Sequence, residues 1–126
     1  MAGAGGWGWV ATGAAGCALA IGAGAFGAHA LQARLDTRSL QLWETAARYL
    51  TYGALGLVLV GLAAQQAPAA GFGRAAWALA GGTLVFAGTV GVLALGGPRW
   101  LGAVTPLGGT LMILGFVLFA WAALRV

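Results

Sequence analysis

Four long apolar segments separated by short polar ones dominate the pattern of residues along the chain. They cover about residues 7–30, 42–64, 77–96 and 100–121. At 1.5 Å of rise per residue, a helix over any of these segments is about 30 Å long, enough to cross the hydrocarbon core of a bilayer once. We therefore predict an all-α integral membrane protein, an antiparallel bundle of four transmembrane helices that forms a single membrane domain over residues 1–126.

The six tryptophans agree with this count of spans, because tryptophan prefers the interface between membrane and water. All six fall near the ends of the predicted segments. Those expected on one side of the bilayer are Trp7, Trp9, Trp77 and Trp121, and those expected on the other are Trp43 and Trp100.

Small residues recur every four positions in the first segment. The stripe consists of Thr12, Gly16, Ala20, Gly24 and Ala28. Such a stripe lets two helix backbones approach closely, so we predict that Gly16, Ala20, Gly24 and Ala28 are helix-packing residues. The pattern fits packing within the chain and also packing between two copies.

A proline interrupts the fourth segment. Pro106 has no amide hydrogen to donate and leaves one carbonyl without its helical partner. We predict a helix break at this residue, either a kink or a short unwound section.

The most polar stretch, residues 32–41, joins the first two segments. Asp36 is a good N-cap residue, so the second helix is predicted to begin near Thr37 and to run along the membrane surface as an amphipathic turn before it descends. Glu44 precedes Arg48 by four residues, the favourable order for an ion pair on a helix.

Composition narrows the class of protein further. Charged residues make up only 6% of the chain and hydrophobic residues 61%, a balance that suits a lipid environment. The net charge of +4 comes from six scattered arginines that form no basic stripe, so membrane lipids and not nucleic acid are the expected partners. Residues 10–26 have the length of a signal-peptide core, but no basic residue precedes them, and we expect a retained span.

The arginines also predict an orientation. Arg34, Arg38 and Arg99 lie in the two loops on one side, with Arg48 nearby, whereas Arg74 and Arg125 lie on the other side. The positive-inside rule then places the first and third loops in the cytoplasm and both termini outside, in a bacterial inner membrane.

One end of the bundle should collect nearly every polar side chain. The candidate polar cluster contains His29, Asp36, Glu44, Arg48, Tyr49, Tyr52, Arg99 and Thr105. It fits a functional site, such as a vestibule or a proton-handling group, and it also fits an interfacial network that fixes the loops. One histidine, one cysteine and two acids match no metal or haem site, and no nucleophile has a paired base, so we predict no metal, no cofactor and no enzymatic activity.

Three motifs resemble those of a known family. They are Gly-Ala-Phe-Gly-Ala-His-Ala-Leu at 24–31, Glu-Thr-Ala-Ala-Arg-Tyr at 44–49 and Val-Thr-Pro-Leu-Gly-Gly at 104–109. In this order they resemble the small four-helix membrane proteins of domain-of-unknown-function family 423, the transmembrane protein 256-like family. The resemblance covers nearly the whole chain and implies four transmembrane helices in a bacterial inner membrane, with no established activity.

The chain departs from that family at two places. Members of the family commonly carry a second histidine after the tyrosine pair of the second segment. This chain has Gly53 at that position, so a mechanism that needs two histidines is not expected. A serine-containing stretch of helix 3 is replaced by Phe86-Ala87-Gly88-Thr89.

Two functions follow from these observations. The first is a structural or interaction role, as a homo-oligomer or as an accessory subunit of a larger membrane complex, indicated by the small-residue stripe and the absence of charge from the span centres. The alternative is an oligomeric channel or carrier for a small solute or proton that uses the polar cluster.

Overall fold

The structure, a computed structural model that describes residues 2–126, with side chains from residue 5 onward, confirms the all-helical prediction. The first span is one continuous rod built from α1 (Ala2–Ile21), the π-helix η1 (Gly22–Gly27) and α2 (Ala28–Leu31). Then follow α3 (Thr37–Gln66), the 3-10 turn η2 (Pro68–Ala70), α4 (Phe72–Ala94) and α5 (Leu101–Leu124). The first-span rod and helices α3, α4 and α5 are all long and apolar enough to cross a membrane, as predicted.

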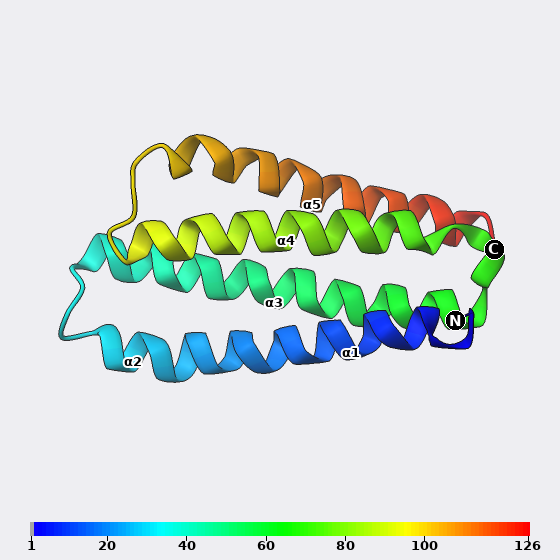
Figure 1. Ribbon diagram of the computed structural model, residues 1–126, viewed down its shortest axis with the longest axis horizontal. Helices are drawn as coiled ribbons and strands as arrows, with labels where there is room; N and C mark the ends of the chain where they lie inside the picture. Colours follow the sequence, from blue (N-terminus) through cyan, green and yellow to red (C-terminus); the bar gives the residue numbers. More distant parts are fainter. Residues whose placement is uncertain (1) are drawn as a thin grey trace.

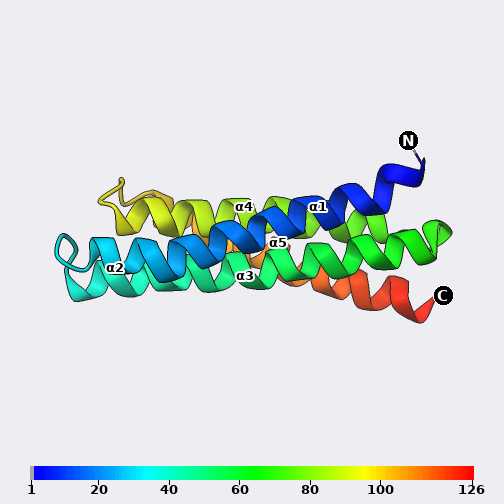
Figure 2. The same ribbon diagram turned by 90° about the horizontal axis from the view of Figure 1, so that it is seen from below.

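The helices lie side by side in their order along the chain (Figure 1). Helix α1 packs along α3, α3 along α4, and α4 along α5, each pair antiparallel, whereas α3 meets α5 over a short stretch only. Both chain ends lie at one end of the bundle, opposite the α2–α3 loop and the α4–α5 turn (Figure 1). Seen from the α1 side, α1 crosses obliquely in front of α3 and α4 (Figure 2).

The face of α1 that packs on α3 has small residues at every seventh position: Gly6, Gly13, Ala20 and Gly27. A Cβ atom added at Gly13 would lie 2.5 Å from the carbonyl oxygen of Ala54, so the two backbones touch there. A repeat of seven corresponds to 3.5 residues per turn, the spacing of a left-handed coiled-coil seam.

Of the predicted packing residues, Gly16, Ala20 and Gly24 lie on the α3 side of the first span, whereas the four-residue stripe does not extend to Thr12. Gly16 and Gly24 face Ala54 and Ala47 of α3, but Thr12 is exposed, and its hydroxyl donates to the Gly8 carbonyl of its own helix. The reason is geometric, because a stripe with a strict period of four drifts around an α-helix of 3.6 residues per turn, and α1 follows the seven-residue seam instead.

Helix α3 also has small residues at every seventh position: Ala47, Ala54 and Gly61. A Cβ atom at Gly61 would lie 2.5 Å from the carbonyl oxygen of Gly6. Beside this contact the backbone amide of Gly6 donates to Oε1 of Gln65 at 3.1 Å. The start of α1 and the end of α3 are therefore held together by a hydrogen bond as well as by packing.

The α4–α5 pair is built in the same way. Added Cβ atoms at Gly82 and Gly108 would lie 2.6 Å and 2.5 Å from backbone nitrogens of the opposite helix, those of Met112 and Phe86. On the same seam the hydroxyls of Thr89 and Thr105 share a hydrogen bond of 2.7 Å. A polar bond between helices has few competitors in lipid, so it fixes the register of this hairpin.

The helix ends follow the local chemistry. Asp36 is the N-cap of α3, as predicted, and its carboxylate accepts the Ser39 amide at 2.8 Å. Gly71 before α4 and Gly96 after it adopt φ values of 83° and 94°, which favour glycine. Residues 95–100 form the turn between α4 and α5, and α4 begins at Phe72, five residues before the predicted third span.

The unwound section predicted as one form of the break at Pro106 is absent, because α5 is α-helical from Leu101 to Leu124, and a kink there stays a prediction. Pro106 lies close to the start of the helix, where it removes only the hydrogen bond to the Gly102 carbonyl. The hydroxyl of Thr105 donates to the Leu101 carbonyl at 3.0 Å and helps to hold this first part of the helix together.

The α1–α3 seam makes a testable prediction. Gly13→Ala should destabilise the protein by about 1–3 kcal/mol, because the new methyl group overlaps the α3 backbone. The measurement is the free energy of unfolding in a titration of micelles with a denaturing detergent. Gly5→Ala is the matched control, since a Cβ atom there has nothing within 4 Å; equal stability of the two variants would contradict the seam.

Candidate functional site

The polar residues predicted to form one cluster do lie at the loop end of the bundle, but the structure divides them among separate places. His29 and Glu44 line one cleft, Arg99 lines a second cavity with Arg38, and the two tyrosines line a third. Asp36, Arg48 and Thr105 line none of these three: Asp36 caps α3, Arg48 is exposed, and Thr105 is bonded to Thr89 in the α4–α5 seam.

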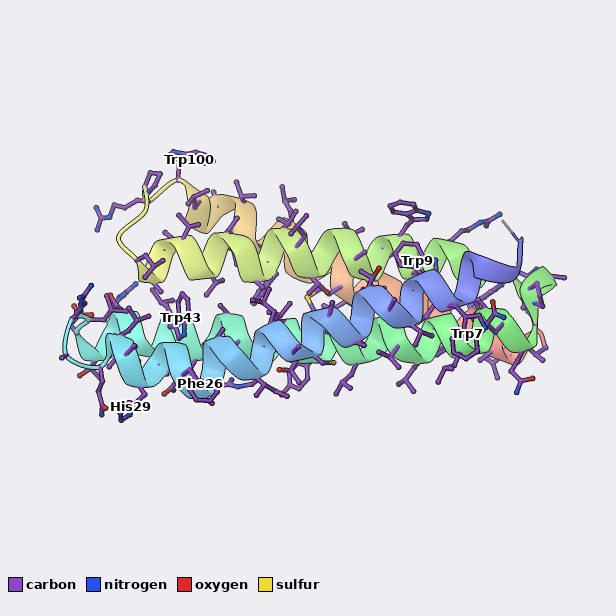
Figure 3. The ribbon with its side chains drawn as sticks, turned by 60° about the horizontal axis from the view of Figure 1, so that its bottom comes forward. Trp7, Trp9, Phe26, His29, Trp43 and Trp100 are labelled. Carbon is purple, nitrogen blue, oxygen red and sulfur yellow. The ribbon has the colours of Figure 1, made fainter. Side chains whose placement is uncertain are left out.

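His29 and Glu44 face a cleft of about 280 Å³ between α2 and the first turns of α3, together with Gln32. His29 is exposed, and Figure 3 shows its side chain directed away from the body of the bundle. Glu44 is exposed too, and in the described part of the chain it forms no ion pair with Arg48. The predicted ion pair between Glu44 and Arg48 is therefore not formed, and the cleft lies at the surface between two exposed side chains.

Beside this cleft the first span contains the π-helix η1, which was not predicted from the sequence. The carbonyl of Ala23 accepts both the Ala28 amide, five residues on, and the indole N–H of Trp43 at 2.7 Å. Gly27 makes room for the indole, because a Cβ atom there would lie 3.0 Å from the ring. A side chain that bonds to a backbone carbonyl inside a helix stabilises such a local change of pitch.

Trp43 therefore differs from the tryptophans that face the membrane. Trp7, Trp100 and Trp121 are 54%, 65% and 63% exposed, as expected for side chains at the interface. Trp43 lies at the predicted end of its span but is partly buried against η1, where it ties α3 to the first-span rod. The three glycines at 22, 24 and 27, followed by a tryptophan at the start of the next helix, are the sequence signal that was available.

Arg99 and Arg38 line the second cavity, of about 540 Å³, between the first turn of α3, the last turn of α4 and the start of α5. The two residues come from distant parts of the chain, the α3 N-terminus and the α4–α5 turn. No acidic residue lines the cavity, so its electrostatic character is basic.

Tyr49 and Tyr52 stand at one end of an apolar groove of about 580 Å³ between α3 and α5. The Tyr49 ring packs on Phe86 of α4, with 4.5 Å between the ring centroids, and on Tyr52 at 5.3 Å. Deeper in the groove the lining is aliphatic and aromatic, with Met112 and Phe116 from α5. The groove has no charged side chain in its lining.

Gly53 packs directly against Thr83 of α4. A Cβ atom at Gly53 would overlap the Thr83 side chain, and its nearest neighbour would be Oγ1. Thr83 is 5% exposed, and among the described side chains its hydroxyl is buried without a hydrogen-bond partner. The oxygen instead faces the α-carbon of Gly53, an arrangement typical of a weak Cα–H···O contact between helices. The space for a larger side chain at position 53 is thus already filled.

Asp36 has the clearest electrostatic perturbation. Its pKa lies below the ordinary value of 3.8, first because the Ser39 amide donates to the carboxylate and also because the Arg38 cation is near. Hydrogen bonds and a nearby cation both favour the charged form. No three metal-binding side chains of the described residues gather in one place, and the expectation of no metal site stays a prediction.

Four apolar spanning helices with short polar connections define a small multi-pass membrane protein. The family model described as "Protein of unknown function (DUF423)" matches residues 23–109, and the chain belongs to this family. The match includes all of the π-helix except Gly22, the Asp36 cap and the Thr89–Thr105 bond. The resemblance of the three sequence motifs to this family is thereby confirmed.

Named relatives share nearly the full length of the chain. The UPF0382 membrane protein SERP0230 of Staphylococcus epidermidis is 38% identical over 117 residues, which are 93% of this chain and 95% of that protein. The UPF0382 membrane protein YwdK of Bacillus subtilis is 36% identical over 118 residues, covering 93% and 96%. No solved structure matches the chain. These relatives establish a bacterial membrane protein whose family has no assigned activity.

The Trp43 bond can be tested by substitution. Trp43→Phe keeps a ring against Gly27 but removes the donor to Ala23, so we expect a loss of about 0.5–1.5 kcal/mol in unfolding free energy. Trp100→Phe, at an exposed tryptophan, should leave stability unchanged. If both variants unfold at the same detergent concentration, the indole bond contributes nothing to the α1–α3 hairpin.

The Asp36 cap predicts a pH dependence. Because the folded-state pKa is depressed, the stabilisation by this carboxylate is fully present above pH 3.8 and is lost as the pH falls through the lower folded value. Helix content measured by circular dichroism between pH 6 and pH 2 should therefore decrease in the wild type through this window. Asp36→Asn, which keeps an uncharged cap, should show a smaller decrease; identical curves would exclude the carboxylate as the source.

Proposed function

We propose that this protein is a non-enzymatic interaction subunit of the bacterial inner membrane that binds another transmembrane helix through the outer face of α1. The outer face is the side of α1 turned away from α3. It consists of Gly8, Ala11, Ala15, Ala18 and Gly22. The observation that carries the proposal is that these small residues repeat as regularly as those of the α3 seam, although no helix of the chain covers them.

The spacing of the outer face is that of a packing seam. Its members follow one another at intervals of three and four residues, the heptad pattern of two helices that pack at a shallow angle. Ala11, Ala15 and Ala18 are exposed, and added Cβ atoms at Gly8 and Gly22 would have nothing within 4 Å. The face is therefore smooth and open along its length.

Close packing within a single copy does not account for the glycines of this face. A glycine inside a helix costs about 1 kcal/mol relative to alanine. At Gly6 and Gly13 close contact with α3 offsets that cost, but Gly8 and Gly22 lack such a contact. Small residues favour association between helices in lipid because they allow extensive van der Waals contact between backbones. A second helix on this face would give both glycines the same role.

The helix bound there belongs either to a second copy of this chain or to another subunit of a membrane complex. The division of the polar residues among separate surface features supports an interaction role over an enzyme or a solute pathway within one copy. The inner-membrane location, with both termini outside, is part of the proposal and rests on the arginines of the two loops at the same end.

A pair of neighbouring substitutions tests the proposal. Ala15→Leu places a bulky group in the centre of the outer face, whereas Ala14→Leu places the same group on the exposed flank. In lipid nanodiscs, association measured by energy transfer between labelled copies, or by recovery of a co-purifying subunit, should fall about tenfold or more for Ala15→Leu. It should remain near the wild-type value for Ala14→Leu. A wild-type protein that is monomeric and carries no partner would contradict the proposed function.

A further inference from the structure

We propose that the face formed by α3, α4 and α5 binds one anionic phospholipid, with its phosphate between Arg38 and Arg99 and an acyl chain in the apolar groove below. This surface lies on helices other than α1, so the proposal is independent of the interaction at the outer face.

The head of the proposed site is the basic cavity at the loop end of the bundle. Arg38 and Arg99 line it from two different elements, and its volume of about 540 Å³ has room for a headgroup. Guanidinium groups bind phosphate oxygens through paired hydrogen bonds. The Asp36 carboxylate is near Arg38, but it accepts the Ser39 amide at the start of α3 and does not line the cavity. Two cations with no acid among them favour an anionic occupant.

The groove that would hold the acyl chain lies on the same faces of α3, α4 and α5 as the basic cavity. Leu42, Leu93 and Gly102 line the basic cavity, and the residues seven positions deeper on each helix, Tyr49, Phe86 and Gly109, line the apolar groove. Seven residues are two helical turns, or about 10 Å. The basic cavity is therefore in line with the groove and lies two turns nearer the membrane surface.

A basic cavity followed by an apolar groove matches the charged headgroup and the acyl chain of a phospholipid. A charged headgroup lies at the membrane surface, and a chain extends from it toward the bilayer centre. The groove below the tyrosines is apolar, is about 580 Å³ in volume and opens between α3 and α5 to the surrounding lipid. A free phosphate would use the basic cavity alone and would leave the groove without a role. Basic pockets at the ends of transmembrane helices are suited to anionic lipids.

The test uses purified full-length protein and native mass spectrometry with phosphatidylglycerol or phosphatidylcholine added at equal concentration. Phosphatidylglycerol should be retained about fivefold or more over phosphatidylcholine, and the preference should fall about fivefold for each of Arg38→Gln and Arg99→Gln. Arg38→Lys and Arg99→Lys, which keep the charge, should retain part of the preference. Arg74→Gln removes a cation at the opposite end of the bundle and should change nothing.

The tail is tested separately. Gly109→Leu fills the groove beside Phe86, whereas Gly88→Leu adds the same group at a position with nothing within 4 Å. Only Gly109→Leu should weaken phosphatidylglycerol retention, with helix content by circular dichroism confirming that both variants fold. Three outcomes would overturn the proposal: no preference between the two lipids, an equal loss in Arg74→Gln, or a lipid displaced by inorganic phosphate and unaffected by Gly109→Leu, which would identify a phosphate site instead.

Discussion

The contact on which the rest of this structure depends is the backbone-to-backbone approach of α1 and α3. Lipid offers little hydrophobic driving force between helices, so close van der Waals packing must supply it. Gly13 against the Ala54 carbonyl and Gly61 against the Gly6 carbonyl provide that packing at two levels. The same approach brings Trp43 within reach of the Ala23 carbonyl, which accounts for the π-helix at Gly22–Gly27.

Glycine contacts of the same kind set the remaining helices and the surfaces that they leave open. Gly82 and Gly108 bring α4 and α5 together, and both helices then lie at a fixed rotation relative to α3. Because α3 and α5 touch over a short stretch only, a groove remains between them. Because α1 packs mainly on α3, with one ring contact from Trp9 to Trp77 of α4, its opposite face remains uncovered. Both proposed functions of the molecule, helix binding and lipid binding, concern surfaces that this regular packing leaves open.

Much of the fold was accessible from the sequence because lipid restricts the chain to spanning helices. Segment length gave the four spans, and Asp36 gave the start of α3. Predictions from the sequence were wrong where an outcome depends on the rotation of one helix against another. Thr12 was expected in a seam that runs elsewhere, and His29 and Arg99 were expected in one cluster, although α2 and the α4–α5 turn hold them on different surfaces. The hydrogen bond from the Trp43 indole to the Ala23 carbonyl depends on the same rotations.

The central claim is that α1 is a helix with two packing seams, one bound to α3 and one for a further helix. The most direct measurement is the relaxation of backbone amides by a spin-labelled lipid in isotope-labelled protein reconstituted in bilayers. The account predicts that Ala11, Ala15 and Ala18 are protected, while Leu84 and Ile113, which are 75% and 67% exposed in a single copy, relax strongly. Equally strong relaxation at Ala15 and Leu84 would show that lipid covers the outer face and would contradict the account.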